Sequence, residues 1–131
     1  MNNGAIGKIL LVDDSQVSRQ ILKSCISKSE QYEFHEVADG VAALEVFRRV
    51  RPDLTFLDIN MPNMNGMACL GEIRKIDDRA LVVMCSSEIQ AETAKDAAAL
   101  GALAVVRKPP TRESIGDALE KAMQALRAAR P

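Results

Sequence analysis

The chain lacks three features that would assign a protein to a broad class at once: a disulfide framework, a long apolar segment and an excess of one charge. Its cysteines, Cys25, Cys69 and Cys85, are odd in number and contain no C-x-x-C pair. This favours reduced thiols in the cytoplasm over disulfides or a zinc site. No stretch approaches the roughly 18 apolar residues of a membrane-spanning helix, and the first residues lack the basic start of a signal peptide. We therefore expect a cytoplasmic protein without a membrane partner.

The charge is balanced, with 17 Lys and Arg against 18 Asp and Glu and a formal net charge of −1. A dedicated nucleic-acid binder usually carries a basic excess, so we expect no direct nucleic-acid partner. Hydrophobic residues make up 47% of the 131 residues, which is sufficient for the core of one domain of common size. We expect a single domain over residues 1–131, in which residues 1–7 form a flexible leader.

Short apolar runs alternate along the chain with longer segments of helical period. The runs that read as buried strands are residues 9–12, 54–57, 80–84 and 104–107, and residues 32–37 alternate as a half-exposed strand does. Such alternation predicts repeated βα units, and hence an α/β fold with a parallel sheet.

Helix starts follow the runs at regular intervals. Ser15 and Thr111 are expected to cap the first and fifth helices, Asp39 and Asn65 begin the second and third, and the fourth spans about residues 89–100. In the first helix, Val17, Ile21, Leu22 and Cys25 recur at spacings of three and four, which predicts one buried face.

About five such units favour a doubly wound, flavodoxin-like parallel sheet of five strands in the order 2-1-3-4-5, with helices on both faces. This order makes the first and third strands neighbours. Asp13 and Asp14 follow the first strand and Asp58 ends the third. Ser86 and Lys108 come at the ends of the fourth and fifth strands. Because parallel strands end at one edge, these groups should meet in one crevice, which suggests a divalent cation and a phosphoryl group.

The residues at these strand ends resemble the receiver domain of two-component response regulators, and in particular single-domain chemotaxis-type receivers. The resemblance rests on Leu-Val-Asp-Asp-Ser at residues 11–15, Asp-Ile-Asn-Met-Pro-Asn-Met-Asn-Gly at residues 58–66, Ser86, and Lys108-Pro109. It covers nearly the whole chain, and the segment 58–66 is its strongest single element.

The resemblance implies a role for each of these residues in phosphorelay signalling. Asp58 would be the phosphoacceptor that forms an aspartyl phosphate, and Lys108 and Ser86 would contact the transferred group. Mg²⁺, or Mn²⁺ in its place, would be bound by Asp13, Asp14, Asp58 and the backbone carbonyl of Asn60. We expect the domain to catalyse only its own phosphorylation and dephosphorylation, so it would not be an enzyme in the ordinary sense.

The resemblance also implies partners. The donor would be a phosphohistidine on a sensor histidine kinase or a phosphotransfer protein, with small acyl phosphates as substitutes. Phosphorylation would switch the surface made by the fourth helix, the fifth strand and the fifth helix, which would bind a downstream protein target. A homodimer through the same surface is left open.

Four positions are expected to modulate this activity. Asn60 and Glu88 stand where family members tune the attack of water on the acyl phosphate, which predicts a short phosphoryl lifetime. Pro109 would follow a cis peptide bond. Val105 stands where the family usually has Tyr or Phe; because valine is stiff and has no ring, we expect switching through shifts of the fourth helix and the loop before it.

Two other interpretations stay open. An aspartate-nucleophile phosphatase-like hydrolase also combines strand-end acids, a hydroxyl residue and a lysine, but its nucleophile belongs to an acid-x-acid motif where this chain has Asp13-Asp14-Ser15. A phosphorylation-independent interaction module is disfavoured by the complete set of acids, hydroxyl and lysine.

Each residue alone also has a structural alternative: Asp13 or Asp14 could be a helix cap, and Ser86 or Ser87 could cap the fourth helix.

Overall fold

The structure is a computed structural model, and it describes residues 5–129 of the chain. Five parallel strands form one sheet in the order β2-β1-β3-β4-β5. The strands are β1 (Lys8–Val12), β2 (Glu33–Val37), β3 (Leu54–Asp58), β4 (Val82–Ser86) and β5 (Ala104–Arg107). The predicted fold class and strand order are confirmed.

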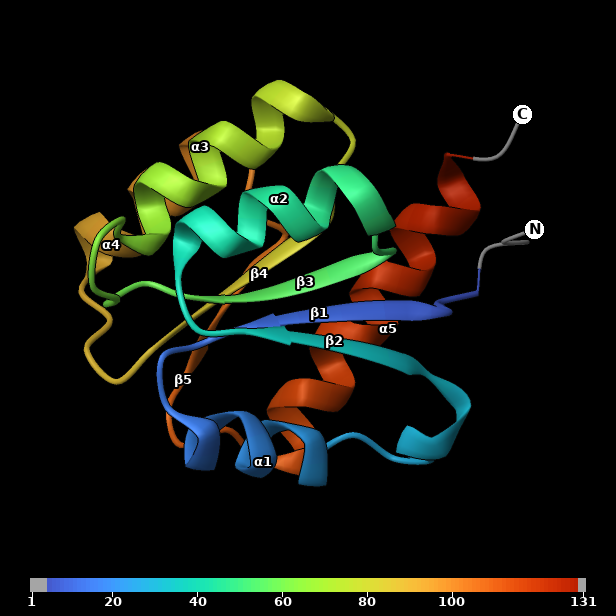
Figure 1. Cartoon of the computed structure of the whole chain (residues 1–131). Helices are drawn as coiled ribbons and strands as arrows, with labels where there is room; N and C mark the ends of the chain where they lie inside the picture. Colours follow the sequence, from blue (N-terminus) through green and yellow to red (C-terminus); the bar gives the residue numbers. More distant parts are fainter. Residues whose placement is uncertain (1–4, 130–131) are drawn as a thin grey trace.

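Helices cover both faces of this sheet (Figure 1). They are α1 (Gln16–Ser24), α2 (Gly40–Val50), α3 (Gly66–Ile76), α4 (Ala91–Ala99) and α5 (Arg112–Ala128), with a short 3-10 helix η1 (Ser29–Gln31) before β2. One core cluster joins the sheet to α1 and α5, and the other joins it to α2, α3 and α4. Within residues 5–129, no helix combines the length and the apolar character needed to cross a membrane.

Strand β1 shows how the sheet fills both cores. Ile9 and Leu11 belong to the cluster under α1 and α5, whereas Leu10 and Val12 belong to the cluster under α2 and α3. Successive side chains of a strand point to opposite faces, so a strand that is covered on both sides must be apolar throughout. The first polar side chains therefore come where the strand ends.

Side-chain caps fix where most of the helices begin. The side chains of Ser15, Asp39 and Asn65 accept hydrogen bonds from backbone N–H groups in the first turns of α1, α2 and α3. Thr111 forms a reciprocal capping box with Ser114 at the start of α5. These four predicted helix starts are confirmed.

Helix α4 begins later than expected, and neither Ser86 nor Ser87, the two possible caps named above, is its N-cap. Its first residue is Ala91, and its N-cap is Gln90, whose side chain makes no capping hydrogen bond in the described part of the chain. Ser86 does not cap it because its hydroxyl is bonded to the backbone of Glu88. The start of α4 is therefore less firmly held than those of the other helices.

The predicted buried face of α1 is only half correct. Leu22 and Cys25 are buried against the core, but Val17 is 68% exposed and Ile21 is 42% exposed. The short helix turns one edge of its apolar stripe away from the sheet, toward a groove beside Pro109 and Lys108. Two large apolar side chains are thus left at the surface.

The flexible leader expected over residues 1–7 is too long. Residues 1–4 lie outside the described residues, so the prediction is untested there. Ile6 is 7% exposed in the core cluster under α1 and α5. The Gly7 N–H donates to Asp53 Oδ2 at 2.8 Å, and the Gly7 carbonyl accepts from Glu33 N–H at 2.8 Å. Ile6 and Gly7 therefore belong to the folded domain, because Ile6 packs in the core and Gly7 extends the pairing of β1 with β2.

Candidate functional site

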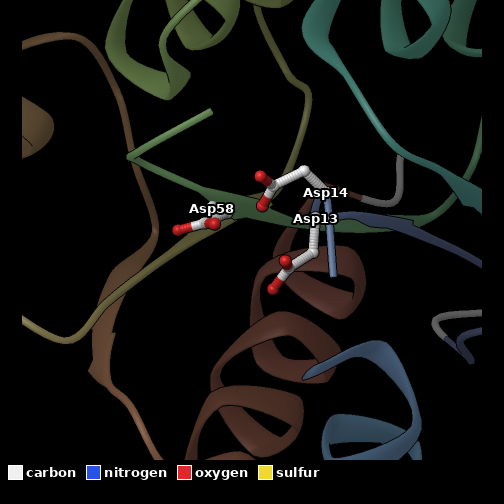
Figure 2. Close-up of side chains that lie close together, drawn as sticks. All are labelled: Asp13, Asp14 and Asp58. Carbon is white, nitrogen blue, oxygen red and sulfur yellow. The ribbon is translucent and has the colours of Figure 1, made fainter. Parts of the chain in front are cut away.

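Three carboxylates meet at the carboxyl edge of the sheet (Figure 2). Asp13 and Asp14 follow β1, and Asp58 ends β3, the strand next to β1. One carboxylate oxygen from each of the three lies within 4.8 Å of the others. Asp13 is 8% exposed and Asp58 is 7% exposed, whereas Asp14 is exposed. The sheet thus holds two buried acids together and leaves the third open to solvent.

Lys108, the residue after β5, places a positive charge between the two buried acids. Its Nζ lies 2.6 Å from Asp13 Oδ2 and 3.2 Å from Asp58 Oδ2. Burial alone would lower the pKa of Lys108, but the hydrogen bond to Asp13 and the charge of Asp58 outweigh it, so the pKa is raised. The lysine therefore stays charged. The Lys108–Pro109 peptide bond is cis, as the resemblance implied.

Asp13 is the most heavily hydrogen-bonded of the three acids. Its Oδ2 accepts from Lys108 Nζ at 2.6 Å and from Ser18 Oγ at 2.6 Å, and its Oδ1 accepts from Ser15 N–H at 2.9 Å. Burial raises the pKa of Asp13, but these hydrogen bonds, that of Lys108 foremost, more than compensate and lower it. Asp13 is therefore held as a carboxylate.

Asp58 is in a less favourable environment. Burial raises the pKa of Asp58 and the charge of Asp13 acts in the same direction, which together outweigh the attraction of Lys108. Its Oδ1 accepts one long hydrogen bond, 3.4 Å from the N–H of the exposed residue Asn60. A carboxylate that is held more loosely than its neighbour, and whose pKa is raised, is the better nucleophile of the two.

Ser86, at the end of β4, is brought to the same edge but its hydroxyl is engaged elsewhere. The residue is 1% exposed. Its Oγ donates to the carbonyl of Glu88 at 3.0 Å and accepts from the Glu88 N–H at 3.1 Å, while Glu88 itself is exposed. The hydroxyl must release the Glu88 carbonyl before it can donate to a group bound at Asp58.

Val105 lies on β5 opposite Met84 of β4 and packs, half-buried, against the core cluster under α2, α3 and α4. It supplies no ring at the position where the family usually has one. Pro109 is exposed beside Lys108. Neither side chain carries a group that could bind a cation or a phosphoryl oxygen.

Cys85 is close to the acids but is not a nucleophile. It pairs with Asp58 across β3 and β4, and burial raises the pKa of its thiol to about 12. Cys25 and Cys69 are also free and buried. A protonated, buried thiol is chemically inert at neutral pH.

Sequence reasoning missed two residues of α1 that support the site. Besides the hydroxyl of Ser18 on Asp13, Arg19 Nη1 donates to the Asp13 carbonyl at 2.5 Å. Arg19 also pairs with Glu36 of β2 at 2.9 Å, as does Lys23. The hydrogen bond from Lys23 is the main cause that lowers the pKa of Glu36. Ser18 and Arg19 both lie in the first turn of α1 after the Ser15 cap, and this closeness to Asp13 along the chain was the signal that the sequence offered.

A shallow groove of about 290 Å³ borders the site. It is lined by the exposed side chains of Val17 and Ile21 on α1, by Lys108, and by Pro109 and Pro110 in the loop before α5. The groove is mostly apolar and runs up to the lysine that contacts both buried acids. A protein that approaches Asp58 from this side would cover it.

The acids fit a small divalent cation. Three carboxylates against the single charge of Lys108 leave the cluster negative, and carboxylate oxygens are the ligands that Mg²⁺ and Mn²⁺ prefer. Asp14 on the exposed side leaves room for the water ligands that Mg²⁺ retains. Asp13, Asp14 and Asp58 are therefore the residues that could hold the ion.

Comparisons with known proteins agree with this geometry. Residues 9–120 match the family described as the response regulator receiver domain. The chain is 36% identical over 115 residues to the chemotaxis protein CheY of Listeria monocytogenes, covering 88% of this chain and 97% of the relative. It is 33% identical over 114 residues to sporulation initiation phosphotransferase F of Bacillus subtilis, covering 87% and 91%.

A solved structure extends the comparison. CheY of Borrelia burgdorferi, in a complex with CheX, BeF3 and Mg²⁺, is similar with a TM-score of 0.80 and 30% identity, covering 94% of this chain and 91% of that one. The similarity of fold and the family match thus indicate the same kind of domain.

Proposed function

The chain belongs to the response regulator receiver domain family, and on that premise we propose that it takes a phosphoryl group from a phosphohistidine onto Asp58. The family makes the chain a phosphoryl-accepting signal receiver of the chemotaxis type. The observation that carries the residue assignment is the contrast between the two buried acids. Asp13 is fixed by three hydrogen bonds, whereas Asp58 has a raised pKa and faces Lys108.

The transfer step is a displacement at phosphorus. A carboxylate oxygen of Asp58 forms the new bond to phosphorus, and the bond from phosphorus to the imidazole nitrogen of the donor breaks. The bonding electrons return to the imidazole, which takes up a proton. Asp58 must be ionised to attack; burial raises its pKa, and the positive charge of Lys108, 3.2 Å away, opposes that rise.

Positioning and charge neutralisation account for most of the catalysis in such a transfer. The ammonium of Lys108 lies 3.2 Å from Asp58 Oδ2, close enough to contact an oxygen of a phosphoryl group attached there. The hydroxyl of Ser86 supplies a second contact once it leaves the Glu88 carbonyl. Asp13, Asp14, Asp58 and the backbone carbonyl of Asn60 would hold a divalent cation, which would supply further positive charge to the phosphoryl oxygens.

The donor protein would bind across the groove beside α1. Val17 and Ile21 give that groove two apolar contacts, and the groove leads directly to Lys108. A sensor histidine kinase or phosphotransfer protein that places its histidine over Asp58 would bury both side chains. The relatives include a sporulation phosphotransferase, which supports a donor of this kind.

The output would be a change in the β4–α4 loop and in the surface of α4, β5 and α5, which then binds a downstream protein. Release of Ser86 from Glu88 removes the hydrogen bonds that shape the loop before α4. Helix α4 has no side-chain cap among the described residues to resist a shift. Because Val105 has no ring to reorient, the loop and α4 carry the change, and a homodimer through this surface stays open.

The domain would act in the cytoplasm and catalyse only its own modification.

The decisive experiment is incubation with acetyl phosphate and Mg²⁺, followed by intact-mass measurement. We expect the mass gain of one phosphoryl group, lost in Asp58→Asn and retained in Asp96→Asn, which changes an exposed aspartate of α4. Phosphorylation that persists in Asp58→Asn would refute the assignment. Repeated turnover of p-nitrophenyl phosphate would instead support the phosphatase-like alternative.

A further inference from the structure

Two groups share one oxygen of Asp13. Its Oδ2 accepts a hydrogen bond from Ser18 Oγ and another from Lys108 Nζ, both at 2.6 Å, while its Oδ1 accepts from the Ser15 N–H at 2.9 Å. With 8% of the residue exposed, water has little access to replace a lost partner. The direction of this carboxylate is therefore set by these three donors.

Lys108 is shared between Asp13 and the site of the proposed phosphoryl group. In this structure its ammonium is closer to Asp13, at 2.6 Å, than to Asp58, at 3.2 Å. The proposed transfer requires the ammonium on a phosphoryl oxygen attached to Asp58. Any shift of the ammonium toward that group weakens its hydrogen bond to Asp13 Oδ2, and the Ser18 hydroxyl is then the closer of the two donors to that oxygen.

Ser18 is the donor that stays in place. It lies in the first turn of α1, which begins at the Ser15 cap. The neighbouring Arg19 fixes this turn to the Asp13 carbonyl and to Glu36 of β2. A short side chain on a helix that is anchored at three points has little freedom to follow Lys108.

We propose that Ser18 is a positioning residue of the cation site: its hydroxyl holds the Asp13 carboxylate in the direction that binding of the ion requires, both before transfer and while Lys108 contacts a phosphoryl group. This inference rests on the proposed function only for the contact between Lys108 and a phosphoryl group. Groups that hydrogen-bond a metal-binding carboxylate typically contribute about 10-fold to 100-fold in metal affinity. Without the hydroxyl, Asp13 Oδ2 keeps Lys108 as its one donor, and the carboxylate is held less firmly in the direction that the ion requires.

The test is a titration with Mn²⁺ in the absence of any phosphodonor, with free Mn²⁺ measured by electron paramagnetic resonance. We expect Ser18→Ala to weaken Mn²⁺ binding about tenfold or more. The matched control is Ser24→Ala, which removes a serine hydroxyl from the same helix. That hydroxyl donates to the Ile21 carbonyl at 2.6 Å and is remote from Asp13. The Ser24→Ala variant should bind Mn²⁺ with the same affinity as the unchanged chain.

A second pair of variants separates the hydroxyl from the shape of the side chain. Ser18→Thr and Ser18→Val have nearly the same volume, and threonine alone keeps the hydroxyl. We expect Ser18→Thr to bind Mn²⁺ like the unchanged chain and Ser18→Val to bind like Ser18→Ala. Equal affinities for the threonine and valine variants, or a loss in Ser24→Ala as large as in Ser18→Ala, would overturn the proposal.

The phosphorylation rate distinguishes this inference from the proposed function. With acetyl phosphate, Ser18→Ala should react slowly at limiting Mg²⁺ and approach the normal rate at saturating Mg²⁺. If the unchanged chain binds Mn²⁺ but takes no phosphoryl group, the proposed function is wrong. The Mn²⁺ affinities of the Ser18 variants would still test the role of Ser18.

Discussion

The backbone of Gly66 is packed against the carbonyl oxygen of Asp58. A Cβ atom at Gly66 would lie 2.1 Å from that oxygen and 2.7 Å from the Cα of Ile59, both of which belong to the backbone. The Gly66 N–H also donates to the Ile59 carbonyl at 2.7 Å. The first residue of α3 is thus in direct contact with the end of the strand that carries Asp58, the proposed acceptor.

Gly66→Ala should therefore lower the free energy of unfolding by about 1–3 kcal/mol, the usual cost of overpacking, and disturb the acceptor. Urea denaturation measures the first effect and acetyl phosphate labelling the second. The control is Gly71→Ala in the same helix, where nothing lies within 4 Å of the added atom. That change should raise stability by about 0.5–1 kcal/mol, and equal losses in the two variants would contradict the packing argument.

Asp58→Asn should stabilise the protein at neutral pH when no divalent cation is present. The pKa of Asp58 is raised above its ordinary value of 3.8, chiefly by burial, so the folded chain binds the proton more tightly than the unfolded chain does. The stability that this provides is present at low pH and is lost as the pH rises through the raised pKa. Asparagine carries no charge and avoids that loss.

The same variant thus predicts a pH profile. Urea denaturation of both proteins should give a difference in unfolding free energy that is small below the ordinary carboxyl pKa of 3.8 and grows toward neutral pH in favour of Asp58→Asn. A difference that does not change with pH would mean that lost contacts, and not charge, determine the effect.

Mg²⁺ should raise the melting temperature, because an ion that binds only the folded chain stabilises it. At 100 times its dissociation constant the gain is about 2.7 kcal/mol. Asp14→Asn should lose most of this gain but melt like the unchanged chain without Mg²⁺, since Asp14 is exposed. Circular dichroism suits the measurement because the chain has no tryptophan. An unaltered response to Mg²⁺ in Asp14→Asn would remove this residue from the cation site.

Val17→Asp should impair transfer from a protein donor but not from a small one. A charged side chain in the groove beside α1 would disrupt the apolar contact that Val17 makes with a protein donor. A loss of about 1.4 kcal/mol in binding free energy would raise the KM for a phosphohistidine protein about tenfold. Acetyl phosphate needs no such surface, so its rate should not change. The control is Val41→Asp, because Val41 is 60% exposed on α2, across the sheet from α1 (Figure 1). Equal impairment in both variants would exclude the groove as the donor surface.

Much of the fold could be predicted because its signals are local. The apolar run of residues 54–57 ends on Asp58, and Thr111 caps α5, so strand and helix limits followed from neighbouring residues. The order of the strands needed the general rule for open α/β sheets as well. The meeting of Asp13, Asp14 and Asp58 then followed from that order.

The features that were missed depend on tertiary distances. Helical spacing places Val17 and Leu22 on one stripe, but it does not say how much of the stripe the sheet covers. Ser18 has the spacing of an ordinary surface residue and gains its importance only through the approach of Asp13. Likewise, Ile6 is isolated in the sequence, and it is buried because β1 has a strand on each side.

The site draws its parts from the ends of β1, β3 and β5, and these segments meet only when the whole sheet has formed. A fragment that stops before β5 would contain Asp58, the proposed acceptor, but not Lys108. If Asp58 accepts the phosphoryl group as proposed, labelling of Asp58 should therefore report that the whole sheet had formed when the transfer took place. A chain that is cut in an exposed loop should regain labelling only when its pieces reassociate, which makes this chemistry a reporter of fragment complementation.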